Sequence, residues 1–188
     1  MLLIGRQALW PITLSVGSLL VVAWTALTNS SPLLVYNASN SVPAGWYSIT
    51  DAHLLAAGDL VLVRLPPETA AFAAQRGYLP STVPLLKTVA ATAPQHVCVR
   101  GNQVMIDSKL VARQLRWDRQ GRTLPTWRVC RRLVDDELFL LSSNPESFDS
   151  RYFGPVSANA VIGRAQPQCP ALLESFAGSN HFCHSIFN

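Results

Sequence analysis

Charged side chains are scarce in this sequence, and lysine is nearly absent. Asp, Glu, Lys and Arg make up 14% of the 188 residues, where about 25% is usual for soluble globular domains. The formal net charge of +4 is carried mostly by arginine, since Lys87 and Lys109 are the only lysines. A basic run and a nucleic-acid-binding motif are both missing, so we expect no nucleic-acid partner.

Histidine-based serine hydrolase patterns are also missing. The Gly-x-Ser-x-Gly nucleophile motif is absent. None of the four histidines lies in a sequence that resembles a serine-hydrolase motif; they are His53, His96, His181 and His184. A serine nucleophile in this chain therefore needs a different base.

The cysteines do not form a Cys-x-x-Cys pair, which argues against a common zinc or thioredoxin-type arrangement. The tail residues 181–184 (HFCH) crowd three metal-type ligands together, unlike zinc spacing, so we expect no metal and no cofactor. An even number of cysteines outside a membrane favours disulfides. The chain has four cysteines, which can pair in three ways, and their spacing does not choose between these pairings. Closure of local loops favours Cys98 with Cys130 and Cys169 with Cys183.

One long apolar run is present. Residues 9–27 carry no charge, and 19 residues at helical rise cross a bilayer core of about 30 Å. Arg6 precedes the run, which predicts a cytoplasmic N-terminus and an exported remainder. A cleaved signal peptide is the competing interpretation, but its apolar region is shorter, and an Ala-x-Ala site before Ser30 is missing. We therefore expect a cytoplasmic segment 1–8, a transmembrane anchor 9–27 and one periplasmic domain 28–188.

The exported part is predicted to be mostly β, with a short helical insertion. Short apolar runs separated by turn signals are typical of strands. The expected strands and hairpin cover residues 59–65, 83–91, 97–107, 138–142 and 160–165. Prolines at the start, an acidic first turn and Gly77 at the end predict a helix over residues 66–76. Residues 112–128 are arginine-rich and poorly patterned, which predicts a long exposed loop.

Residues 36–47 (YNASNSVPAGWY) are rich in hydroxyl and turn residues. Pro43 and Gly45 fix a bend that would hold the hydroxyl of Ser41 exposed at a set angle. An ordinary polar loop is the alternative, because Ser, Pro and Gly are common turn residues. A serine hydroxyl also needs a base before it can attack an amide.

Lysine can serve as that base in a Ser-Lys dyad. Its amine must then be neutral near pH 7, so its pKa of about 10.4 must fall by roughly three units, which burial can achieve. The neighbours of Lys87 in the sequence are Leu85, Leu86 and Val89. The alternative for Lys87 is an edge strand with the amine in water. Local sequence leaves both interpretations open.

Three segments resemble, in order, the motifs of the type I signal peptidases, the S26 family. Residues 39–47 (SNSVPAGWY) look like the nucleophile box and residues 85–90 (LLKTVA) like the lysine box. Residues 147–154 (SFDSRYFG) look like the C-terminal box. This last run and two of the cysteines are most similar to the conjugal-transfer branch, the TraF-type peptidases. The resemblance covers residues 36–165.

The resemblance implies a signal-peptidase-like β-barrel or sheet domain and a role for each matched residue. Ser41 is expected to be the nucleophile and Lys87 the general base. The backbone N–H of Ser41 and the hydroxyl of Ser39 are expected to form the oxyanion hole, whose donors are each worth about 10²–10³ in rate. Ser147 is expected to orient the amine of Lys87.

Asp149 and Arg151 are expected, by the same resemblance, to form a supporting ion pair. In some TraF-type enzymes an aspartate near this point is tied to joining the ends of a new pilin into a ring, and Asp149 is the matching residue. Two departures from typical signal peptidases narrow the expected substrate range. Residues 93–95 read APQ in place of Pro-Gly-Asp, and residues 142–144 read SSN in place of Gly-Asp-Asn.

The predicted function is a membrane-anchored serine endopeptidase of the bacterial inner membrane, single-pass, with a periplasmic catalytic domain. Its expected partners are inner-membrane lipid and an exported precursor, a conjugative pilin propeptide, with cyclisation of the product as a further expectation. The alternatives are a non-catalytic membrane-anchored component of a conjugation or secretion apparatus and a passive anchored β domain. The presence of Ser41, Lys87 and Ser147 together favours the peptidase.

Overall fold

A computed structural model describes residues 15, 17–18 and 34–168 of the chain. Ser15 and its two described neighbours are helical. Within these described residues, no helix is both long enough and apolar enough to cross a bilayer. The predicted anchor at residues 9–27 lies almost wholly outside them.

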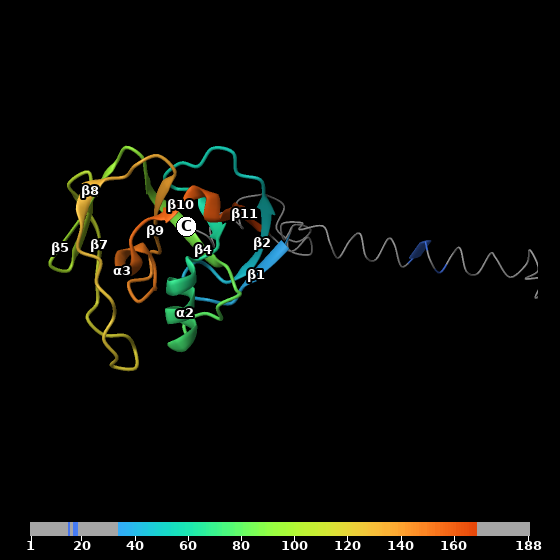
Figure 1. Cartoon of the computed structure of the whole chain (residues 1–188), viewed down its shortest axis with the longest axis horizontal. Coiled ribbons are helices and arrows are strands. Elements are labelled where there is room, and N and C mark those ends of the chain that lie inside the picture. Colours follow the sequence, from blue (N-terminus) through green and yellow to red (C-terminus); the bar gives the residue numbers. More distant parts are fainter. Residues whose placement is uncertain (1–14, 16, 19–33, 169–188) are drawn as a thin grey trace, which may run out of the picture. The chain divides into compact units, whose positions relative to one another are not determined.

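The domain is built from two antiparallel sheets, as the predicted mostly β class requires. The seven-stranded sheet has the order β1-β2-β11-β3-β4-β9-β10, and the four-stranded sheet has the order β7-β6-β5-β8. The strands of the larger, curled sheet are β1 (Leu34–Asn37), β2 (Gly45–Thr50), β3 (Leu60–Val63), β4 (Leu85–Thr92), β9 (Glu137–Leu141), β10 (Val156–Ser157) and β11 (Val161–Gln168). The smaller sheet contains β5 (His96–Arg100), β6 (Gln103–Ile106), β7 (Lys109–Arg113) and β8 (Cys130–Arg132). Figure 1 shows the smaller sheet at one end of the domain and β1 and β2 at the other.

The short helices of the domain are α2 (Pro67–Gln75), α3 (Ser150–Phe153) and the 3-10 turn η1 (Ala158–Ala160). Helix α2 begins with a proline, carries Glu68 in its first turn and is followed by Gly77 at a φ of 68°. These are the start and stop signals that predicted it. The expected strands and the hairpin at residues 97–107 are also present.

Strand β4 contributes residues to three hydrophobic core clusters. Its Val89 packs in one core cluster with Leu140 of β9. Ala91 packs with β5, β6 and β9 in a second cluster, and Leu86 packs in a third. A strand covered on both faces is expected to be almost continuously apolar, which makes the lysine within it exceptional.

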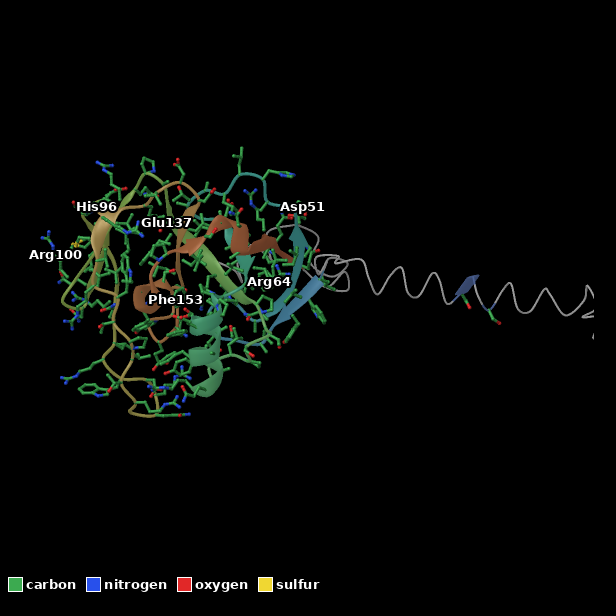
Figure 2. All side chains as sticks on the ribbon, viewed as in Figure 1. Asp51, Arg64, His96, Arg100, Glu137 and Phe153 are labelled. Carbon is green, nitrogen blue, oxygen red and sulfur yellow. A yellow bond between two sulfur atoms is a disulfide. The ribbon has the colours of Figure 1, made fainter. Side chains whose placement is uncertain are left out.

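A disulfide joins two strands of the smaller sheet, and an ion pair joins this sheet to the larger one. The expected pair Cys98 and Cys130 forms a disulfide between facing residues of β5 and β8. Arg131 of β8 pairs with Glu137 at the start of β9, with a nitrogen–oxygen distance of 2.6 Å; Figure 2 labels Glu137. The predicted second pair, Cys169 with Cys183, lies outside the described residues.

Two sequence expectations need correction. Residues 36–47 are not a single loop, because Asn37 ends β1 and Gly45 begins β2, leaving only residues 38–44 between the paired strands. The exposed loop predicted over residues 112–128 starts within β7, which ends at Arg113. Residues 114–129 run mostly without regular structure, but Gln114 and Leu124 are buried there rather than exposed.

Candidate active site

Ser41 lies in the loop that joins β1 to β2, which we call the nucleophile loop (residues 38–44). The last pair of the hairpin before this loop is Asn37 with Gly45. Gly45 adopts a φ of 154°, which residues with a side chain rarely adopt. The loop brings Ser41 to β4 and to the segment after β9, far away in the sequence.

The amine of Lys87 lies against the hydroxyl of Ser41. Lys87 Nζ is 2.5 Å from Ser41 Oγ and also donates a hydrogen bond to Ser147 Oγ. The two serine oxygens are 3.2 Å apart. The structure therefore brings together three side chains from β4, the nucleophile loop and the C-terminal box.

Burial removes the amine of Lys87 from water. Only 1% of the residue is exposed. Strand β4 is also an interior strand, with β3 and β9 as its two neighbours in the sheet. The edge-strand interpretation is therefore wrong. Burial lowers the pKa of Lys87 from 10.5 to about 8, while the Asp149 carboxylate raises it and Arg151 lowers it further. An amine with this pKa is partly neutral at physiological pH.

Asp149 and Arg151 form an ion pair beneath the site. Arg151 Nε donates to Asp149 Oδ1 at 2.7 Å, and its Nη2 donates to Oδ2 at 2.9 Å. Asp149 is fully buried and Arg151 is 1% exposed. The backbone N–H of Ser142 also donates to Asp149, at 3.0 Å. Since its carboxylate has no exposed surface and is fully engaged, Asp149 faces its partners rather than a bound substrate.

The two predicted oxyanion donors are close together but engaged with other groups. The backbone N–H of Ser41 donates to Ser39 Oγ at 3.4 Å. The Ser39 hydroxyl in turn donates to Asn37 Oδ1 at 2.8 Å. A substrate oxyanion must therefore draw both protons toward itself, and the Ser39 hydroxyl must rotate away from Asn37.

A cleft of about 740 Å³ opens beside these groups. Ser41, Lys87 and Ser147 all line it. Its apolar lining residues include Leu62, Leu65, Leu85, Leu86 and Phe148. Space of this size and character suits an extended peptide with apolar or small side chains.

Residues 115–124 supply much of the remaining wall of the cleft. Asp118 anchors this segment, because it accepts hydrogen bonds from the hydroxyl of Tyr78 at 2.6 Å and from Arg122 Nε at 2.7 Å. The Arg122 guanidinium also donates to the carbonyl of Arg76, just after α2. Sequence reasoning missed this wall, because a polar, arginine-rich segment has no pattern that indicates its contacts.

The fold and the site together define a peptidase of the signal-peptidase type. Comparison with known proteins agrees: the family model described as "Signal peptidase, peptidase S26" matches residues 6–169. The chain belongs to the S26 signal peptidase family.

Several curated relatives cover most of the chain. A "Probable conjugal transfer protein TraF" of Sinorhizobium fredii (strain NBRC 101917 / NGR234) is 37% identical over 140 residues, or 69% of this chain and 73% of the relative. A "Conjugal transfer protein TraF" of Agrobacterium tumefaciens (strain 15955) is 35% identical over 154 residues, or 70% and 79%. A "Plasmid transfer protein TraF" of Escherichia coli is 29% identical over 137 residues, or 66% and 76%.

Proposed function

We propose that this chain is a membrane-anchored serine endopeptidase in which Ser41 is the nucleophile and Lys87 is the general base. The observation that carries the proposal is the 2.5 Å separation of Lys87 Nζ and Ser41 Oγ at a lysine that is 1% exposed. Burial supplies the neutral amine that the chemistry requires, and the short separation supplies the path for the proton.

The reaction follows from these positions. As Ser41 Oγ attacks the scissile carbonyl carbon, its proton passes to Lys87 Nζ. The hydrogen bond to Ser147 keeps the amine aimed at Ser41. Negative charge on the former carbonyl oxygen is met by the N–H of Ser41 and the rotated hydroxyl of Ser39. The lysine then gives its proton to the departing amine, and an ester on Ser41 remains.

Two nucleophiles can resolve that ester. Water, deprotonated by Lys87, releases a carboxylic acid and restores the Ser41 hydroxyl. The amino group at the N-terminus of the fragment held on Ser41 can attack instead; the ester C–O bond breaks, an amide forms, the Ser41 hydroxyl is restored, and the product is a ring that is lighter by one water than the hydrolysed fragment. The names of the relatives support a role in conjugal transfer. The substrate that we propose is an exported precursor of the conjugation apparatus, a pilin propeptide.

The direct test is cleavage by Ser41→Ala and by Ser143→Ala, a matched control at an exposed neighbouring serine. The full chain is purified in detergent and incubated with a peptide library that carries small residues around the cut. Products are identified by mass spectrometry. We expect Ser41→Ala to lose cleavage by at least about 10⁴-fold, as for a removed nucleophile, and Ser143→Ala to match the wild type. Normal cleavage by Ser41→Ala would contradict Ser41 as the nucleophile, whereas no cleavage by the wild type would favour a non-catalytic component.

The pH dependence of cleavage gives an independent prediction. Protonated Lys87 cannot accept the proton of Ser41, so kcat/KM should rise with pH, about tenfold per unit, and level off above pH 8. The midpoint of this rising part of the pH profile, the pH limb, is set by the lowered Lys87 pKa of about 8. Initial rates between pH 5.5 and 10, roughly one measurement per half unit, locate the midpoint. A limb centred near pH 6, typical of histidine, would contradict the lysine base.

A further inference from the structure

Side chains hold the backbone of the nucleophile loop along its whole centre. Each backbone carbonyl oxygen of residues 39–43 accepts a hydrogen bond from a side chain. Five successive carbonyls held in this way leave the loop little freedom, although it has no regular structure. The carbonyl oxygens of an exposed loop are ordinarily satisfied by water.

Asn37 supplies most of these bonds from inside the loop. Its Nδ2 lies 3.0 Å from the carbonyl oxygen of Ser39, 2.9 Å from that of Val42 and 3.1 Å from that of Pro43. Its Oδ1 accepts from the backbone N–H of Ser39 at 3.1 Å and from the Ser39 hydroxyl at 2.8 Å. Asn37 is only 7% exposed. One amide side chain thus fills the interior of the loop and positions Ser39.

The remaining two carbonyls are held by the segment that follows β9. Asn144 Nδ2 donates to the carbonyl of Asn40 at 3.1 Å, and Ser142 Oγ donates to the carbonyl of Ser41 at 2.5 Å. Ser142 is itself fixed, since its own carbonyl accepts from Arg151 Nη2 at 2.8 Å. Ser142 therefore connects Arg151 of the buried ion pair to the backbone of Ser41 by two hydrogen bonds.

These contacts set the direction of the oxyanion donor. The peptide unit between Asn40 and Ser41 is planar and trans, so its C=O and N–H point in opposite directions. When Asn144 holds the carbonyl of Asn40, it fixes the direction of the Ser41 N–H. Ser142 fixes the next peptide unit in the same way. The nucleophile and its N–H are therefore aimed by groups that do not touch the substrate.

We propose that Asn37, Ser142 and Asn144 are positioning residues that hold the nucleophile loop in its attacking geometry. The inference rests on the proposed function of Ser41 and adds three residues to its machinery. Misplacement of a reacting group by about 1 Å costs on the order of 10²-fold in rate. Losing one of these anchors should therefore lower kcat and leave substrate binding in the cleft, and so KM, nearly unchanged.

The test compares Asn37→Ala, Asn144→Ala and Ser142→Ala with the exposed controls Asn102→Ala and Ser143→Ala. The full chain in detergent is assayed on the library peptide that it cleaves fastest. We expect kcat to fall about 10²-fold for Asn37→Ala and about tenfold for the other two anchors. KM and the midpoint of the pH limb should stay at wild-type values, and the controls should behave as wild type.

Conservative variants separate positioning from a general loss of packing. Ser142→Thr keeps the hydroxyl and should recover most of kcat, whereas Ser142→Ala should not. Asn37→Asp keeps the shape but donates no hydrogen bond, so it should fail like alanine. If thermal unfolding shows that Asn37→Ala does not fold, the comparison of kcat between Ser142→Thr and Ser142→Ala tests the positioning role.

The outcomes separate the two proposals. Wild-type kcat in all three alanine variants, or a raised KM with unchanged kcat, overturns the positioning role. If these variants behave in that way while Ser41→Ala is inactive, only the inference fails. If Ser41→Ala cleaves normally, the proposed function itself fails.

Discussion

Replacing Lys87 with methionine is expected to abolish cleavage and, at the same time, to stabilise the fold. Folding lowers the pKa of this amine from 10.5 to about 8. At pH 7 folding therefore buries a charge that is solvated in the unfolded chain, and this burial reduces the free energy of unfolding. A shift of this size corresponds to about 3 kcal/mol. Methionine has a similar length and no charge, so the free energy of unfolding should rise by up to that amount.

The sign of this effect depends on pH. Below about pH 8 the amine is protonated in both states, and the wild type carries the full cost of burial. Between about pH 8 and 10.5 the unfolded chain binds the proton more tightly, so wild-type stability rises with pH. The advantage of Lys87→Met should therefore shrink over that range. Denaturant unfolding at pH 7 and at pH 10 measures the difference.

The matched control is Lys109→Met, at the only other lysine, which is exposed on β7. It should leave cleavage and stability unchanged. Lys87→Arg should be inactive as well, because arginine does not give up its proton at working pH. A Lys87→Met variant that cleaves normally, or is less stable than the wild type at pH 7, would contradict the account.

Of all the proposed substitutions, Arg151→Met should lower the free energy of unfolding the most. The variant leaves the Asp149 carboxylate fully buried without its countercharge, and breaking a buried pair in this way costs about 3–5 kcal/mol. It also removes the hydrogen bonds from Arg151 to the carbonyls of Ser142 and Pro145. Urea unfolding at pH 7 measures the change.

The exposed pair of Arg119 and Glu146 provides the comparison. Its side chains are 65% and 44% exposed, so Arg119→Met should cost less than about 1 kcal/mol. Adding Asp149→Leu to Arg151→Met should recover part of the loss, because the unpaired charge is then gone. A loss below about 1 kcal/mol for Arg151→Met alone would show that the buried pair is not what holds this segment.

The sequence predicted the individual helices and strands around the site better than it predicted how those elements pair in the fold. Turn chemistry and apolar runs predicted α2, β3, β4 and the hairpin of β5 and β6, because those signals are local. Strands β1 and β2 were missed, since β1 has only four residues and its short apolar run ends at Asn37. They are ordered by pairing with each other and by the pairing of β2 with β11, which local sequence does not indicate.

Burial of Lys87 could not be decided from its neighbours. An apolar run with one lysine fits both an edge strand and an interior strand. The position of β9 beside β4 decides it, and that pairing joins residues about fifty positions apart in the sequence. Asn37 was missed for a similar reason, because its importance depends on which carbonyls surround it after folding.

Direct titration of Lys87 tests the central claim most simply. The chain has two lysines, so protein labelled with ¹³C-lysine gives two side-chain signals, and the one absent from Lys87→Met belongs to Lys87. We expect that signal to titrate with a pKa of about 8 in the folded protein. A Lys87 signal that remains protonated above pH 10 would contradict the account, because no neutral amine would then be present to activate Ser41.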